Sequence, residues 1–134
     1  MKKFKILIPV FNDWESLTKL LEEINFSIKD ITGCIFECLI VNDASNIKPP
    51  KITVPKKINL IQIINMKENR GHARCNAHGL RYLSNNEKFD HLIIMDGDGE
   101  DRPEEIKLLV NKALLNEKIS IVANRIKRSE GFFF

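Results

Sequence analysis

The segment Lys5-Ile6-Leu7-Ile8-Pro9-Val10 is a short apolar run, and Asp13–Ile28 follows it with leucine and isoleucine at helical spacing. The run predicts a buried strand, and the spacing predicts an amphipathic helix that Asn12 or Asp13 can cap. The same alternation continues along the chain. Further strands are expected at Ile35–Val41, Asn59–Ile64, His91–Met95 and Ile119–Ala123, with helices at Gly71–Leu83 and Pro103–Leu115. Repeated strand-helix-strand units predict an α/β fold, a parallel sheet with helices on both faces.

Two segments carry further local expectations. In the helix Gly71–Leu83, Ala73, Ala77 and Leu80 lie on one face, which is the expected buried face. Ile47–Lys57 contains three prolines and is expected to be a loop.

Composition limits the class of protein. A chain of 134 residues predicts one domain, and 43% hydrophobic residues suffice for one core. A net charge of +3 is mildly basic and gives no reason to expect nucleic acid as a partner. The odd set of Cys34, Cys38 and Cys75 has no zinc-type spacing, which favours buried, inert thiols and a reducing compartment. No stretch approaches the ~20 apolar residues of a membrane span, so we expect a cytoplasmic protein.

Polar residues cluster where the predicted strands end. Asn12-Asp13 follows the first strand, Asn42-Asp43 the second, Asn69-Arg70-Gly71 the third, and Asp96-Gly97-Asp98 the fourth. Ligands of open parallel sheets bind beyond the carboxyl ends of the strands. The convergence of these clusters therefore predicts a binding site at that edge.

The acidic turn that begins at Asp96 is the most specific of these clusters. Asp96 and Asp98 are close like charges, which repel one another unless a cation joins them. Mg²⁺ typically takes one or two carboxylates together with substrate phosphates. A solvated acidic turn that caps the next helix is the plainer alternative. The position after a buried strand at the ligand edge favours the metal site.

Four motifs together resemble family 2 glycosyltransferases of the GT-A fold, and within them the branch of dolichol-phosphate mannose synthase and bactoprenol glucosyltransferases. The segment from Asp96 to Glu105 resembles the family's D-A-D-L-Q-x-P-P-E. The other three are Ile8-Pro9-Val10-Phe11-Asn12-Asp13 for P-x-Y-N-E, Ile40-Val41-Asn42-Asp43-Ala44-Ser45 for V-D-D-G-S, and Asn69-Arg70-Gly71-His72 for the N-x-G loop. The resemblance implies a Rossmann-like three-layer sandwich with a mostly parallel sheet, of which residues 1–134 are the nucleotide-sugar-binding half.

The resemblance also implies residue roles. Asp96 and Asp98 are expected to bind Mn²⁺ or Mg²⁺ against the donor diphosphate, and Arg125 to lie near a phosphate. Asp43 is expected to be an exposed carboxylate that accepts the N–H of a uracil or guanine ring. The residues expected to form the donor nucleotide pocket are Pro9, Phe11, Asp13, Asp43, Gly71 and Asp96.

The implied reaction transfers a sugar from a UDP- or GDP-linked donor to an acceptor, a polyprenyl phosphate or a cell-envelope glycan, at the inner face of the membrane. In the family the catalytic base and the acceptor segment follow the fifth strand, so no catalytic residue is assigned here. We expect the chain alone to be a poor transferase that needs a missing C-terminal half.

Three alternatives remain open at this stage. The first is a catalytically inactive nucleotide-sugar-binding module. The second is a nucleotidyltransferase, which normally has a glycine- and arginine-rich loop after the first strand, where this chain has Phe11-Asn12-Asp13-Trp14. The third is a phospho-acceptor receiver domain, which needs an aspartate after the third strand, where this chain has Ile64-Asn65-Met66.

Overall fold

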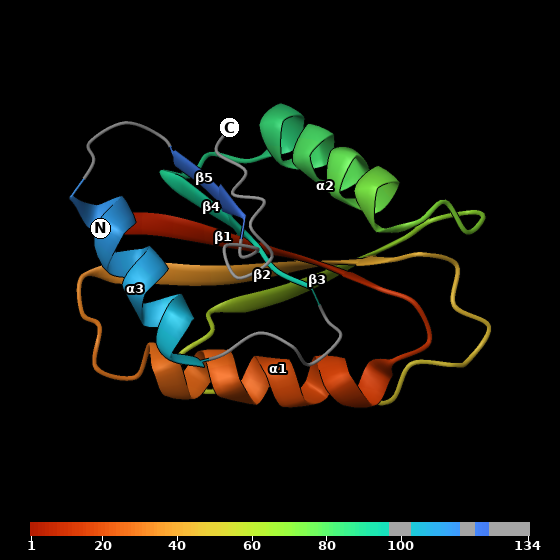
Figure 1. The fold of residues 1–134 in the computed structure, drawn as a ribbon, viewed down its shortest axis with the longest axis horizontal. Helices are drawn as coiled ribbons and strands as arrows, with labels where there is room; N and C mark the ends of the chain where they lie inside the picture. The colour runs from red at the N-terminus through yellow and green to blue at the C-terminus, as the bar shows by residue number, and fades with distance from the viewer. Residues whose placement is uncertain (97–102, 116–119, 124–134) are drawn as a thin grey trace.

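The computed structural model describes residues 1–96, 103–115 and 120–123. Within them the chain alternates strands and helices as predicted (Figure 1). The strands are β1 (Lys2–Val10), β2 (Cys34–Asn42), β3 (Leu60–Asn65), β4 (His91–Ile94) and β5 (Ser120–Ala123). The helices are α1 (Trp14–Ser27), α2 (His72–Asn86) and α3 (Pro103–Leu114). The predicted boundaries differ from these by a few residues at most, as expected for helix and strand ends.

The sheet has the order β3-β2-β1-β4-β5, and every pairing is parallel. From β1 the chain first builds one side of the sheet, with β2 and β3, and later the other side, with β4 and β5. The strand order therefore reverses between β1 and β4. This is the topological switch point at which open α/β sheets bind their ligands.

Helices cover both faces of the sheet, which makes the three layers of the predicted α/β sandwich (Figure 1). Alternate residues of a strand point to opposite faces. On β1, Phe4, Ile6 and Ile8 pack in one core with α1 and α3, whereas Leu7 packs in a second core with α2. The α/β prediction is confirmed.

The buried face of α2 is only partly the predicted one, since Leu80 is partly buried against the second core. Ala73 and Ala77 are exposed, and the helix instead buries Cys75, Gly79 and Leu83. Gly79 explains the difference, because a Cβ atom there would lie 2.5 Å from Leu7 Cδ1. The side of the helix that carries Gly79 therefore packs against the sheet.

The segment 43–59 joins β2 to β3 without a helix, as its prolines predict. It returns the chain from the carboxyl edge of the sheet to the amino edge. It is tied to α1 at both ends: Trp14 Nε1 donates to Ile47 O at 2.9 Å, and Lys57 N donates to Asn25 Oδ1 at 2.7 Å.

Candidate donor-binding edge

Asn12 organises the loops that follow β1 and β2. It has a positive φ of 62°, a conformation that asparagine tolerates better than most residues. Its N–H donates to Ser45 Oγ at 2.8 Å, and its Oδ1 accepts from Asn46 N at 2.9 Å and Ile47 N at 3.1 Å. One side chain thus holds the second loop against the first.

Asn42 performs a similar role between β2 and β3. Its Nδ2 donates to Asn65 Oδ1 at 2.9 Å, and its Oδ1 accepts from Ser45 N at 3.1 Å. The next turn contains Ala44 at a φ of 56°, a left-handed conformation that favours glycine. The family motif that this segment resembles has glycine at this position. The chain therefore has the backbone conformation that suits glycine, but the residue is alanine.

Asp43 differs from its predicted setting. It is only 1% exposed, so the expectation of an exposed carboxylate is wrong. The carboxylate accepts from Arg70 N at 2.7 Å through Oδ1 and from Gly71 N at 2.8 Å through Oδ2. The Asp43 N–H donates to Val10 O at 2.8 Å, and its carbonyl accepts from Asn69 Nδ2 at 3.3 Å. Asp43 therefore connects the end of β1 to the loop that opens α2.

A buried thiol lies beside this carboxylate. Burial, assisted by the hydrogen bond and negative charge of Asp43, raises the pKa of Cys75 to about 12. The pKa of the buried Cys38 also rises to about 12, because of burial. Both thiols are therefore protonated at neutral pH, as predicted for inert cysteines. Cys34 departs from the prediction, since it is only half-buried.

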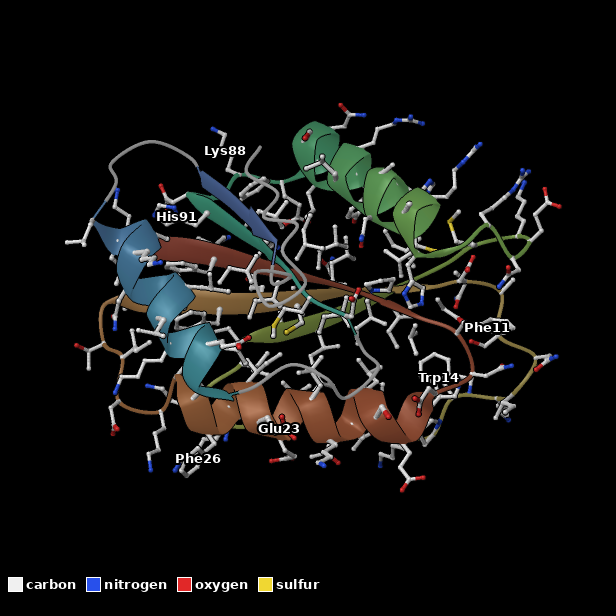
Figure 2. The ribbon with its side chains drawn as sticks, in the orientation of Figure 1. Phe11, Trp14, Glu23, Phe26, Lys88 and His91 are labelled. Atoms are coloured by element: carbon white, nitrogen blue, oxygen red, sulfur yellow. The ribbon has the colours of Figure 1, made fainter. Side chains whose placement is uncertain are left out.

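The residues at and just after the end of β1 differ in burial. Pro9 is buried within the strand, whereas Phe11 is exposed just after it, at the same end of the molecule as Trp14 (Figure 2). Asp13 is exposed and caps α1, because its Oδ1 accepts from Ser16 N at 3.2 Å. Trp14 is 4% exposed and packs in the core.

Asp96 lies directly after β4, at the switch point. Met95 N donates to Leu7 O at 2.9 Å, which keeps the chain paired with β1 up to this residue. Asp96 is 8% exposed. The other predicted metal and phosphate ligands, Asp98 and Arg125, lie outside the described residues. Within residues 1–96, 103–115 and 120–123, no group of three or more histidine, cysteine or acidic side chains is placed to hold a metal ion.

The predicted pocket residues thus lie at one edge of the sheet, although their contacts differ. Asp43 and Gly71 are joined by a hydrogen bond, and Asp96 stands at the reversal of strand order. The roles of Asn12 and Asn42 in bracing the loops were not predicted. The positive φ of Asn12 has a weak sequence signal, because asparagine directly after a strand is common in such turns.

An all-parallel sheet with polar loops at its switch point defines a Rossmann-like α/β protein, a class whose members bind their ligands at the carboxyl edge. The family model for glycosyl transferase family 2 matches residues 5–134, and the chain belongs to this family.

Curated relatives add detail. An undecaprenyl-phosphate 4-deoxy-4-formamido-L-arabinose transferase of Photorhabdus laumondii is 31% identical over 116 residues, which is 84% of this chain and 34% of the relative. Proteins of the same description from Salmonella paratyphi B and Salmonella newport are each 29% identical, over 99% of this chain and 40% of theirs. The chain thus spans about 40% or less of the length of these relatives. Among the described residues, no helix is long and apolar enough to cross a membrane.

Proposed function

We propose that this chain binds the nucleoside-diphosphate sugar of a family 2 glycosyltransferase reaction, in which the sugar passes to a polyprenyl phosphate. The observation that carries the proposal is the position of Asp96. It follows β4 at the switch point, on the same edge as the loops of residues 11–13, 43–46 and 69–71. The family and the names of the relatives support the class of donor and acceptor.

A divalent cation fits this edge in its chemistry. Mg²⁺ and Mn²⁺ take oxygen ligands, and Mg²⁺ commonly uses one or two carboxylates with substrate phosphates, so a cage of three protein ligands is not required. Asp96 supplies one such carboxylate, and we propose Asp98 as the second. The bound cation would stabilise the negative charge that develops on the departing diphosphate.

The nucleoside would occupy the loops on the β1–β2–β3 side of Asp96. We propose that Pro9, Phe11, Asp13, Asp43 and Gly71 shape its pocket. Arg125 is proposed to contact the diphosphate. A lipid-linked acceptor requires the enzyme to work at a membrane surface, and we propose the inner face of the membrane as that place.

The first experiment measures donor binding by calorimetric titration with UDP and GDP in Mg²⁺ or Mn²⁺, and again in EDTA. We expect binding that EDTA abolishes. Asp96→Asn should weaken it at least about tenfold, because a charge-assisted contact contributes roughly 1.5–3 kcal/mol. Asp30→Asn is the matched control, since Asp30 is an exposed aspartate that follows α1, away from the carboxyl edge.

Two results would count against the proposal in different ways. Equal affinity with and without EDTA would show that donor binding needs no metal ion. Absence of binding by any nucleoside diphosphate would remove the donor site altogether. A transfer assay with labelled donor and polyprenyl phosphate then separates a working transferase from a module that binds the donor without turnover.

A further inference from the structure

The connection between β2 and β3 is strongly basic. Residues 44–67, which comprise this connection and β3, contain five lysines and no aspartate, glutamate or arginine, so the stretch has a charge of +5. The net charge of the whole chain is only +3, so the remaining residues sum to −2. Such a charge asymmetry within one chain indicates an anionic partner for the basic segment.

Three lysines of the connection are available to a partner. Lys48, Lys51 and Lys56 are exposed, and none of them forms an ion pair with a carboxylate of residues 1–96, 103–115 or 120–123. Lys57 differs, because it is partly buried and its Nζ donates to Ile31 O at 3.3 Å. The free positive charge therefore lies between the two ends of the connection.

The helix beside the connection is not part of this basic surface. α1 has exposed Glu15 and Glu22, and its Lys19 lies 3.9 Å from Glu23. None of these glutamates pairs with a lysine of the connection in the described part of the chain. The positive surface is therefore limited to the connection itself.

Apolar side chains are exposed among the lysines. Ile47 is 55% exposed and Val54 is 47% exposed. A soluble polyanion would gain little from these side chains, whereas the interface of an anionic bilayer takes up lysines and apolar side chains together. α2 provides a contrast, because Arg74 and Arg81 are exposed on it but none of its large apolar side chains is. The combination that suits a bilayer is thus found on the connection and not on α2.

The connection is also held in one shape. Pro49, Pro50 and Pro55 each fix a backbone φ angle. Both ends of the connection are hydrogen-bonded to α1, as described above. A surface that is already ordered loses less conformational entropy when it binds. The lysines and apolar side chains are therefore presented on a preorganised backbone.

We propose that the β2–β3 connection docks this protein on a bilayer that contains anionic lipid. Lys48, Lys51 and Lys56 would contact the headgroups, and Ile47 and Val54 would insert between them. In Figure 1 the connection, drawn in yellow, leaves β2 at the carboxyl edge and passes the start of α1. Docking there would bring the proposed donor site close to a lipid-linked acceptor. The inference rests on the proposed function for this purpose, whereas the docking surface is defined by its own residues.

Vesicle flotation tests the docking. The purified chain is mixed with vesicles of phosphatidylglycerol and phosphatidylcholine in equal parts, and with vesicles of phosphatidylcholine alone. We expect binding to the first kind only, and added salt should weaken it because ions screen the lysine charges. Each lysine near an anionic surface contributes about fivefold in affinity, so Lys48→Gln combined with Lys51→Gln should weaken binding about twentyfold.

A second variant tests the apolar part of the surface. Ile47→Asn combined with Val54→Asn should weaken binding to the anionic vesicles at least about fivefold, because two half-exposed aliphatic side chains no longer leave water. Thermal melts and UDP titrations of each variant check that the fold and the donor site are retained. Both variants change exposed side chains, so we expect both to fold.

Arg81→Gln combined with Lys88→Gln is the matched control. It removes the same amount of charge from exposed positions on and just after α2, on the face of the sheet opposite α1. Figure 2 shows Lys88 at the end of the molecule away from Phe11 and Trp14. The control variant should bind the anionic vesicles within about twofold of the unaltered chain, because charges away from the contact are screened.

The inference is overturned if the Lys48 and Lys51 variant binds anionic vesicles as tightly as the unaltered chain, or if phosphatidylcholine vesicles bind equally well. Tighter binding of single-stranded RNA, lost in the same variant, would assign the surface to nucleic acid and also overturn it. A chain that binds UDP but no vesicles overturns the docking alone. A chain that docks through these lysines but binds no nucleoside diphosphate overturns the proposed function alone.

Discussion

The two edges of the sheet differ in what their acidic side chains bind. At the amino edge, Lys5 is fully buried on the central strand, and its Nζ contacts Glu37 on β2 and lies 2.9 Å from Glu87 Oε1 at the end of α2. At the carboxyl edge, Asp13 and Asp43 accept main-chain N–H groups. At the first edge Glu37 and Glu87 neutralise a buried cation, and Asp90 accepts the Lys3 N–H at 2.8 Å. At the second edge Asp13 and Asp43 hold loops in shape.

This difference separates stability from binding. The lysine cluster joins β1, β2 and α2 on the side of the sheet toward its amino edge, the end opposite the proposed donor site. Figure 2 shows Lys88 and His91 at that end and Phe11 and Trp14 at the other. Changes at the amino edge should therefore alter the free energy of unfolding without altering donor affinity. Changes at the carboxyl edge should alter both.

The largest effect is expected from Lys5→Met. It leaves Glu37 and Glu87 close together without their shared cation, and removing one partner of a buried ion pair destabilises by about 3–5 kcal/mol. Lys3→Met is the matched control, because Lys3 Nζ is more exposed and lies 3.8 Å from the same glutamate, so the loss should be within about 1 kcal/mol. Chemical denaturation measures both. Weaker UDP binding by folded Lys5→Met would contradict the expectation that the amino edge affects stability and not donor affinity.

The same substitution has a pH signature. Burial acts to lower the pKa of Lys5, but its hydrogen bonds to Glu37 and Glu87 and their charges outweigh burial, so the pKa is raised above its ordinary 10.5. A raised folded-state pKa contributes stability that is fully present below the unfolded value and is lost as pH rises through the folded value. The stability gap between the unaltered chain and Lys5→Met should stay constant from neutral pH to about pH 10.5 and narrow above it.

Asn12→Ala should have an intermediate effect. It removes two loop hydrogen bonds and places alanine at a φ of 62°, which together should cost about 2–3 kcal/mol. Asn12→Asp keeps an acceptor oxygen and tolerates the same φ, so it should stay close to the unaltered chain. Thermal melts and UDP titrations of both variants test this. Normal donor affinity in a destabilised Asn12→Ala would show that the two loops need no bracing to bind.

The smallest expected effect is a gain. Ala44→Gly relieves a left-handed backbone that costs alanine about 1–2 kcal/mol, although glycine loses about 0.5–1 kcal/mol more conformational entropy. The net stabilisation should be about 0.5–1 kcal/mol. Ala77→Gly, at an exposed position inside α2, should destabilise by about 1 kcal/mol instead. If both substitutions destabilise, the turn at Ala44 is not strained.

The sequence predicts the order of elements well, because buried parallel strands are continuous apolar runs and α1 has a clear helical period. It predicts α2 less well. The small residues of that helix do not reveal which face is buried, since the decisive fact is how close Gly79 comes to Leu7. Lys5 marks the expected start of the first strand, yet it lies near the middle of β1. Its burial could not be predicted either, because its partners come from distant segments.

For the site, the sequence predicts the edge at which polar residues gather. It does not predict which of them hold loops in place and which would contact a ligand. The hydrogen bonds of Asp43 span 27 and 28 residues, and no local pattern encodes such pairs. The sequence motif therefore suggests a set of ligand contacts, whereas the structure shows that part of it holds the other loops in place.

The bond between Asn12 and Asn46 joins residues 34 positions apart. Closing a loop of that length is opposed by chain entropy, and α1 and β2 lie within it, so the bond can form only after both have packed on β1. We therefore expect the proposed donor-binding edge to be completed late in folding. Partly folded chains would not capture a nucleotide, and nucleotide binding in a refolding experiment would mark the arrival of the native state.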